Sequence, residues 1–249
     1  MLFMELSIII CTLNEELYLP KLLESIRQQE GVVYEILIID AGSTDATKLA
    51  VERFAESSLM SVQFVAAMRG IAKQRNFGAT LAKYENLLFL DADVLLPNDF
   101  LKNATSEITD NQYLIAGTKI FAAEKSRGYR LVYWTYSNTY LPVVRLFNTV
   151  LHGCSIFVTK TLHEQIGGFQ SGITFEDFAY GAAAAKFSHP KLLRSTYVRT
   201  SARRFYDTSP RKVWELVKGA LQSFYKKELP DSQFKAYHET AGRHIAPKY

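Results

Sequence analysis

Stretches of hydrophobic residues alternate with amphipathic segments through the first half of the chain. Residues 6–10, 35–39, 62–65 and 87–90 are largely apolar over the length of a strand, and segments with helical periodicity separate them. This alternation is typical of a sheet whose strands run mostly parallel and whose faces are covered by helices. The pattern predicts an α/β fold with a mostly parallel central sheet flanked by helices.

The connections between these strands predict helices. Asn14 is placed to cap the first helix, and a third helix is expected over residues 71–82. Four apolar residues share one face of the first helix: Leu19, Leu22, Leu23 and Ile26.

The second connection predicts a helix that begins near residue 45. Ser43 or Asp45 is placed to cap it. Leu49, Ala50 and Phe54 are then expected to face inward.

The second half of the chain has a less regular pattern. Aromatic residues gather between 129 and 140, a short strand is expected at 155–158, and an amphipathic helix is expected over 210–227. No repeat, low-complexity tract or linker separates the halves. We therefore expect one domain over residues 1–249.

Composition narrows the class of protein. The chain is 48% hydrophobic and 22% charged, an ordinary globular balance, and Cys11 and Cys154 lack the spacing of a zinc site or a disulfide framework. No leading segment resembles a signal peptide. Polar and charged residues interrupt the apolar stretch 129–158, which argues against a membrane span. We expect a cytoplasmic protein that contacts the inner membrane face peripherally, if at all.

The net charge of +4 is unevenly distributed. Residues 186–249 carry 14 basic and 5 acidic residues, whereas the preceding part of the chain is net acidic. A cationic surface of this kind suits phosphate-bearing substrates, an anionic membrane face or nucleic acid. A solvated helix face explains the same residues equally well.

Polar side chains follow three of the apolar strands. Thr12, Asp40 and Asp91 each lie at or just past a strand end, and ligands of open α/β sheets bind outside that edge, so we expect the three to converge. Asp91 and Asp93 can together coordinate a hard divalent ion. The alternative is that Asp91-Ala92-Asp93 only caps the following turn.

Six segments in order resemble a family 2 glycosyltransferase with the GT-A fold, over residues 6 to about 205. They are Ser7-Ile8-Ile9-Ile10-Cys11-Thr12-Leu13-Asn14-Glu15, Ile39-Asp40-Ala41-Gly42-Ser43-Thr44-Asp45, Arg69-Gly70 with Arg75-Asn76, Phe89-Leu90-Asp91-Ala92-Asp93, Gly167-Gly168-Phe169 and Phe175-Glu176-Asp177. Each segment is common by itself, and their order and spacing make the resemblance specific.

The resemblance implies a site for a nucleoside diphosphate sugar. Thr12, Asn14 and Glu15 are expected to line the nucleotide, and Asp40 to belong to the nucleoside pocket. A turn residue is the alternative for Asp40. Many relatives carry a second aspartate where this chain has Ala41, so UDP is the default donor nucleotide and GDP stays open.

The aspartate pair is expected to hold the metal. The resemblance places Asp91 on the ribose side and makes Asp93 the principal ligand of a divalent ion, Mn²⁺ or Mg²⁺. Such an ion offsets the charge that develops on the leaving phosphate.

Arginines are the candidates for diphosphate contact. Arg69 and Arg75, which precede or open a helix, can grip the diphosphate or orient the sugar. Arg203 or Arg204 resembles an arginine that closes over the diphosphate in relatives. A plain basic surface patch is the alternative for this last pair.

The pair Glu176-Asp177 resembles the acid pair that deprotonates the acceptor in the family. Asp177 is the candidate base and Glu176 its structural partner, which implies direct displacement with inversion. The alternative is that both are acids at a helix N-terminus, stabilised by the helix dipole.

We therefore expect an inverting, metal-dependent glycosyltransferase that acts on a glycan, a lipid-linked or a small-molecule acceptor. Residues 1–110 would bind the nucleotide sugar, residues 111–205 the acceptor, and residues 206–249 would form a basic helix and tail. The alternatives are a sugar nucleotidyltransferase, disfavoured because residues 12–16 contain neither glycine nor lysine, and a non-catalytic module that binds anions, membranes or nucleic acid. A dehydrogenase is disfavoured because no Gly-x-Gly-x-x-Gly follows the first strand, and no nucleic acid partner is expected.

Overall fold

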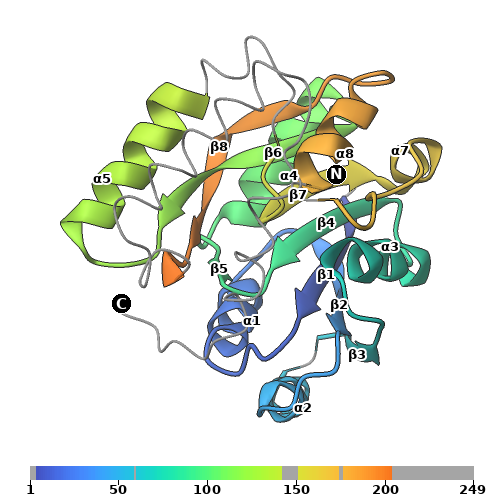
Figure 1. The fold of residues 1–249 in the computed structure, drawn as a ribbon, viewed down its shortest axis with the longest axis vertical. Coiled ribbons are helices and arrows are strands. Elements are labelled where there is room, and N and C mark those ends of the chain that lie inside the picture. Colours follow the sequence, from blue (N-terminus) through green and yellow to red (C-terminus); the bar gives the residue numbers. More distant parts are fainter. Residues whose placement is uncertain (1–3, 59, 142–150, 174–175, 204–249) are drawn as a thin grey trace.

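The computed structural model describes residues 4–58, 60–141, 151–173 and 176–203 (Figure 1). Its eight strands form one sheet: β1 (Glu5–Thr12), β2 (Val33–Asp40), β3 (Val62–Ala66), β4 (Asn86–Asp91), β5 (Val94–Leu95), β6 (Ile115–Ala122), β7 (Ser155–Thr159) and β8 (Lys191–Thr200). Its helices are α1 (Leu19–Arg27), α2 (Thr47–Ser57), α3 (Ile71–Leu81), α4 (Phe100–Asn111), α5 (Arg127–Thr135), the π-helix η1 (Tyr136–Tyr140), α7 (Lys160–Gln165) and α8 (Glu176–Ala184).

The strand order is β3-β2-β1-β4-β7-β6-β8-β5. The first four of these strands are parallel. β7 pairs antiparallel with β4 and β6, β6 and β8 are parallel, and the short β5 pairs antiparallel with β8. The prediction of an α/β fold with a mostly parallel sheet flanked by helices is confirmed.

The central strands are mostly apolar because both faces of the sheet are covered. Ile8 and Ile10 of β1 pack in one core with α1 and α4, whereas Ile9 between them packs in a second core with α3, α7 and α8. A strand that alternates between two buried faces needs hydrophobic side chains at nearly every position. This explains why residues 8–10 and 87–90 are unbroken hydrophobic runs, whereas the buried hydroxyl of Ser7 donates a hydrogen bond to Glu35.

The first predicted helix is confirmed, but its cap is not. The four apolar residues predicted for its inner face are fully buried. The helix begins later than expected, after Tyr18, and Pro20 lies in its first turn. Asn14 has a positive φ of 57°, and its side-chain oxygen accepts a hydrogen bond from the backbone N–H of Thr44. Asn14 therefore joins two loops instead of capping α1.

The second predicted helix faces the core differently from the expectation. Leu49 is 44% exposed, while Val51 and Thr47 are buried. The expectation that Leu49 faces inward was therefore wrong. Asp45 accepts the backbone N–H of Thr47, the first helical residue, whereas the hydroxyl of Ser43 donates to Asp40 instead.

Past residue 95, the pattern predicted only part of the structure. The strand expected at 155–158 is β7, and the helix after the acid pair is α8. α4, β6, α5 and β8 had not been predicted. The expected helix over 210–227 lies outside the described residues.

Among the described helices, none has the combination of length and apolar character that crossing a bilayer requires.

Close packing of α3 on the sheet depends on a helical glycine. A Cβ added at Gly78 would lie 2.4 Å from Cγ2 of Ile9 and 3.1 Å from Cγ1 of Ile39. We expect Gly78→Ala to lower the free energy of unfolding by about 1 to 3 kcal/mol through overpacking, measured by urea denaturation. Gly128→Ala in α5 is the matched control, because only Ser126 Oγ lies near its added Cβ, at 3.8 Å. That variant should be neutral or stabilised by up to about 1 kcal/mol; equal effects of both changes would contradict the packing argument.

Candidate functional site

The carboxyl ends of β1, β2 and β4 meet at one edge of the sheet. Thr12 is in register with Asp40, and Cys11 is in register with Asp91. The predicted convergence of Thr12, Asp40 and Asp91 is therefore confirmed. Because these strands are parallel, the loops that leave them all lie at the same edge.

The carboxylate of Asp40 is held by its own turn. Oδ1 accepts the hydroxyls of Thr12 (2.8 Å) and Ser43 (2.5 Å), and Oδ2 accepts the backbone N–H groups of Gly42 (3.0 Å) and Ser43 (2.8 Å). Asp40 is 4% exposed. This geometry establishes a turn role for Asp40, and its contact with a nucleoside stays a prediction.

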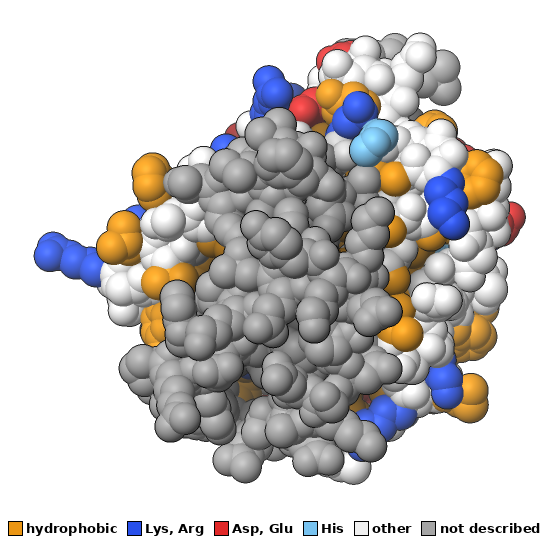
Figure 2. All heavy atoms as spheres, turned by 45° about the horizontal axis from the view of Figure 1, so that its top comes forward, with side chains coloured by type: hydrophobic (Ala, Val, Ile, Leu, Met, Phe, Trp, Pro, Cys, Tyr) orange, Lys and Arg blue, Asp and Glu red, His pale blue; other side chains and the backbone are white. Residues whose placement is uncertain are grey.

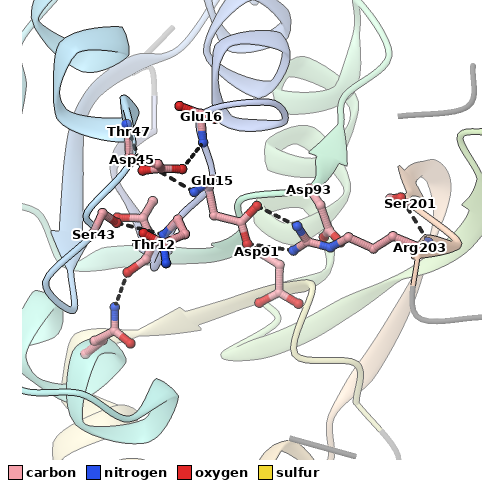
Figure 3. A network of polar contacts seen from close by, with 12 residues as sticks. Thr12, Glu15, Glu16, Ser43, Asp45, Thr47, Asp91, Asp93, Ser201 and Arg203 are labelled. Carbon is pink, nitrogen blue, oxygen red and sulfur yellow. Dashed lines mark hydrogen bonds and ion pairs between the residues drawn. The ribbon is translucent and has the colours of Figure 1, made fainter. Parts of the chain in front are cut away.

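Backbone N–H groups of the loop after β1 are bound by side chains of the loop after β2 (Figure 3). Those of Asn14, Glu15 and Glu16 donate to Ser43 Oγ, Thr47 Oγ1 and Asp45 Oδ2, at 2.8, 2.8 and 3.1 Å. Glu16 also accepts the backbone N–H of Ala46. Each loop thereby supplies the hydrogen-bond partners of the other, which fixes the backbone at the predicted nucleotide edge.

Gln74 of α3 also fixes this edge, and the sequence pattern had not singled it out. Its side-chain amide donates to the carbonyls of Thr12 (3.0 Å) and Ile39 (2.7 Å). Gln74 is 4% exposed. The signal in the sequence is a glutamine on the buried face of an amphipathic helix. A buried side-chain amide needs hydrogen-bond partners, so it is expected to bind neighbouring backbone groups.

The turn Asp91-Ala92-Asp93 joins β4 to β5. Asp91 Oδ1 accepts a hydrogen bond from Arg75 at 3.0 Å, and Asp93 Oδ2 forms an ion pair with Nε of Arg203 at 3.0 Å. Asp93 is 4% exposed. Each predicted metal-binding carboxylate is therefore next to one arginine.

Arg75 lies inside the protein and contacts both halves of the site. Besides Asp91, its guanidinium donates to Glu176 Oε1 (2.9 Å) and the carbonyl of Gly153 (3.0 Å), and it lies 5.0 Å from the ring centre of Phe169. The neighbouring carboxylates raise the pKa of this guanidinium against the effect of burial. Through these contacts Arg75 holds the carboxylates of Asp91 and Glu176 in position. Its predicted contact with the diphosphate stays a prediction.

Asn76 binds the Gly167-Gly168-Phe169 segment and explains why a glycine stands at position 168. Its amide donates to the carbonyl of Phe169 and accepts the N–H of Phe169, both at 2.8 Å. Gly168 has a φ of 71°, and a Cβ there would lie 2.7 Å from Asn76 Oδ1. The close approach of the two segments therefore requires a glycine at this position.

Glu176 and Asp177 begin α8, which agrees with the alternative that both are acids at a helix N-terminus. The two oxygens of Asp177 accept the backbone N–H groups of Gly153 (2.8 Å) and Phe178 (2.9 Å). Burial, with the charge of Glu176 as the second cause, raises the pKa of Asp177 from 3.8 to about 6. Asp177 is therefore ionised at neutral pH and is more basic than an ordinary carboxylate.

Arg203 reaches back across the sheet edge to two acids (Figure 3). Nη1 and Nη2 donate to the two oxygens of Glu15 at 2.7 and 2.6 Å, in addition to the ion pair with Asp93. The guanidinium lies 4.5 Å from the ring centre of Tyr18. Arg203 is thus brought to the predicted site, which a basic surface patch would not explain.

The roles of the remaining two predicted arginines, Arg69 and Arg204, are not tested by the structure. Arg69 is exposed in the loop before α3, and it takes no part in the contacts described above. Arg204 lies outside the described residues. Their contacts with the diphosphate stay predictions.

The acids at this edge suit a hard divalent ion. No group of three or more His, Cys, Asp or Glu side chains is arranged to hold a metal among residues 4–58, 60–141, 151–173 and 176–203. Mg²⁺ at a nucleotide site is commonly held by one or two carboxylates together with substrate phosphates and water. Asp91 and Asp93 match that requirement, so the residues fit an ion that arrives with a diphosphate.

The fold and this edge define a glycosyltransferase of the GT-A class. Residues 7–164 match the family described as "Glycosyl transferase family 2". The chain belongs to this family.

Curated relatives agree with this assignment. The Staphylococcus aureus (strain MW2) protein "Poly(ribitol-phosphate) beta-N-acetylglucosaminyltransferase TarS" is 32% identical over 111 residues, which are 43% of this chain and 19% of that protein. The "Uncharacterized glycosyltransferase YwdF" of Bacillus subtilis (strain 168) is 26% identical over 189 residues, 74% of this chain and 69% of that protein. The chain thus spans about a fifth of the length of the first of these.

Solved structures share the fold. The crystal structure of S. aureus TarS 1-349 in complex with UDP-GlcNAc superposes with a TM-score of 0.66 at 16% identity, covering 93% of this chain and 75% of that one. The mannosyltransferase PcManGT from Pyrobaculum calidifontis, in complex with GDP-Man and Mn²⁺, superposes with a TM-score of 0.69 at 21% identity, covering 95% and 68%. The prediction of a GT-A fold is confirmed.

The raised pKa of Asp177 has a measurable effect on stability. Below pH 3.8 the carboxyl is neutral in both states, and above about pH 6 it is charged in both, so the folded state loses stability between these values. We expect Asp177→Asn to gain up to about 3 kcal/mol relative to the unchanged protein on going from pH 4 to pH 7. Urea denaturation at both pH values measures this change, and any pH-independent effect of lost hydrogen bonds cancels.

The exposed Asp110 offers a matched control, since Asp110→Asn should show little such change. An Asp177→Asn variant whose relative stability is the same at pH 4 and pH 7 would contradict the raised pKa.

Proposed function

We propose that the protein is an inverting glycosyltransferase that moves a sugar from a nucleoside diphosphate to an acceptor hydroxyl with the help of a divalent ion. The observation that carries the proposal is the pairing of Asp91 and Asp93 at the sheet edge with a basic carboxylate, Asp177, at the start of α8. Arg75 links the two, because it contacts Asp91 and Glu176 together. Inversion needs a base for the acceptor as well as a stabilised leaving group.

The donor is a nucleoside diphosphate sugar, with UDP as the default nucleotide. The titles of the neighbouring structures name UDP-GlcNAc in one case and GDP-Man in the other, which supports the class of donor and leaves both bases open. Ala41 has no side-chain hydrogen-bond acceptor for a base. The ordered loops after β1 and β2 would then supply the nucleotide contacts.

Asp93, with Asp91, would hold a Mn²⁺ or Mg²⁺ ion that comes with the diphosphate. Bound there, the ion would offset negative charge on the leaving diphosphate. A neighbouring structure was determined with Mn²⁺, which supports this cofactor.

Asp177 is proposed as the base. As the acceptor oxygen forms its bond to the anomeric carbon, the bond from that carbon to the phosphate oxygen breaks, and the acceptor proton passes to Asp177. The backbone N–H groups of Gly153 and Phe178 hold the carboxylate in place and leave lone pairs for the proton. A base with a pKa of about 6 is ionised in neutral solution, as this step requires.

Loss of Asp93 should abolish metal-dependent nucleotide binding. We expect Asp93→Asn to weaken the binding of UDP or GDP in the presence of Mn²⁺ by at least tenfold, since even changes to residues behind a metal ligand cost about 10- to 100-fold. Isothermal titration calorimetry with each nucleotide, with and without Mn²⁺, measures this effect.

Asp99→Asn, at an exposed position outside the site, is the matched control and should bind like the unchanged protein. Unchanged affinity in Asp93→Asn, or binding of NAD in place of a nucleoside diphosphate, would overturn the proposal. Salt-sensitive binding to DNA without any response to sugar nucleotides would instead favour a non-catalytic module.

The acceptor is proposed to be a glycan or lipid-linked chain of the cell envelope, at a membrane surface. α5 presents exposed apolar side chains, Leu131 (65%), Val132 (60%) and Trp134 (55%), beside exposed Arg127 and Arg130. At the left edge of Figure 2, where α5 lies, hydrophobic and basic side chains stand next to each other. Such a combination is typical of helices that lie in the interface of an anionic membrane.

The charge of the sequence around α5 favours an anionic partner. Residues 125–163 contain five Lys or Arg and no Asp or Glu. The sequence after residue 186 is also strongly basic, so neither that tail nor a second copy of α5 offers complementary charge. The opposite face of α5 packs through Tyr133 onto Ala122 and Ala202, next to Arg203.

We expect the protein to bind vesicles that contain phosphatidylglycerol and to lose most of that binding when both Leu131→Ser and Trp134→Ser are introduced. Leu131 and Trp134 would be buried in the membrane interface on binding, so removal of both apolar side chains should cost about 3 kcal/mol or more of interfacial energy. Vesicle sedimentation measures it, and Phe187→Ser, which removes another exposed hydrophobic residue, is the control. Equal binding to neutral vesicles, or binding unaffected by the double change, would reject this surface.

A further inference from the structure

The guanidinium of Arg203 lies between two acids at the edge proposed to bind the metal. It makes two hydrogen bonds to Glu15 and an ion pair with Asp93 (Figure 3). The side chains are largely buried, with exposed fractions of 17% for Arg203, 12% for Glu15 and 4% for Asp93. A positive charge of the protein itself therefore lies next to Asp93.

This charge compensates a strongly acidic environment. Burial raises the pKa of Glu15, Arg203 lowers it, and Asp93 and Asp91 raise it further. Carboxylates gathered in this way need a cation nearby, because leaving them unpaired in a desolvated place is costly. A divalent ion and a guanidinium both meet that need, but the oxygen of Asp93 that pairs with Arg203 cannot serve both fully at once.

The backbone before Arg203 is held independently of its side chain. The N–H of Ser201 donates to the carbonyl of Asp93 (3.2 Å), and the N–H of Ala202 donates to the buried Glu124 (2.6 Å). Strand pairing joins Thr200 to Val94. The guanidinium can therefore leave Asp93 while the segment that carries it stays in place.

We infer that Arg203 is a positioning residue that holds Glu15 and Asp93 in the absence of donor and competes with the divalent cation for Asp93. The inference rests on the proposed function for the identity of that cation. When the ion binds Asp93 together with a diphosphate, the released guanidinium is free to pair with the phosphates, which are the other anions at this edge. Binding of metal without nucleotide is then weak, and nucleotide and metal strengthen each other's binding.

The test is a comparison of metal and nucleotide affinity in Arg203→Ala. Titration of Mn²⁺ followed by electron paramagnetic resonance, without nucleotide, should show about fivefold or more tighter binding, since a competing cation has been removed. Calorimetry with UDP and GDP at saturating Mn²⁺ should show about tenfold weaker nucleotide binding, the loss of roughly one charge-assisted contact. A purely structural role for Arg203 would instead weaken both, because Asp93 would lose its position.

Two further variants complete the test. Arg203→Lys keeps the charge but not the planar fork, so its Mn²⁺ affinity should lie between those of the unchanged protein and Arg203→Ala. If circular dichroism shows that Arg203→Ala does not fold, the Mn²⁺ affinity of Arg203→Lys tests the competition instead. Arg199→Ala removes an exposed arginine of β8 and should change neither affinity.

The possible failures are distinct. Unchanged or weaker Mn²⁺ binding in both Arg203 variants, with normal nucleotide binding by the unchanged protein, would overturn the competition and leave the proposed function standing. Absence of any nucleoside diphosphate binding by the unchanged protein would overturn the proposed function, whereas the nucleotide-free Mn²⁺ titration would still decide whether Arg203 competes for Asp93.

Discussion

The geometry of the site depends on the buried guanidinium of Arg75. It joins the end of β4, through Asp91, to the start of α8, through Glu176, and to the carbonyl of Gly153 before β7. A buried arginine is tolerated only when its donors are satisfied, and removal of one partner leaves an uncompensated charge in the interior. Arg75 therefore holds the acids on the two sides of the site in one arrangement, and loss of its contact with either acid would cost free energy.

The sequence predicted the features that are decided by local physics and by one topological rule. The middle parts of β1 and β4 are unbroken apolar runs because both of their faces are buried, and that requirement is visible in residues 8–10 and 87–90. The convergence of Thr12, Asp40 and Asp91 followed from the rule that ligands bind outside the carboxyl ends of parallel strands. Neither prediction needed a knowledge of distant contacts.

The features that were missed or misassigned depend on contacts across long stretches of sequence. Arg75 meets Glu176 across 101 positions, and Arg203 meets Glu15 across 188; no periodicity records such pairs. Asn14 has the residue type of a helix cap, but its side-chain oxygen instead accepts a hydrogen bond from the loop after β2. Leu49 fits an amphipathic pattern, yet the sheet ends beside α2 at β3 and leaves that side of the helix in solvent.

The two carboxylates of the Asp91-Ala92-Asp93 turn are each paired with an arginine, but the surroundings differ. Arg75 is 2% exposed, and a Cβ on Gly153 would lie 2.6 Å from its Nη2, so the protein closes around it. Arg203 is 17% exposed and is carried by a backbone held through other hydrogen bonds. Withdrawal of Arg75 would bury unpaired charge, whereas water or an arriving cation can compensate Asp93 when Arg203 withdraws. The same kind of ion pair is therefore a permanent support at Asp91 and an exchangeable contact at Asp93, two residues further along one turn.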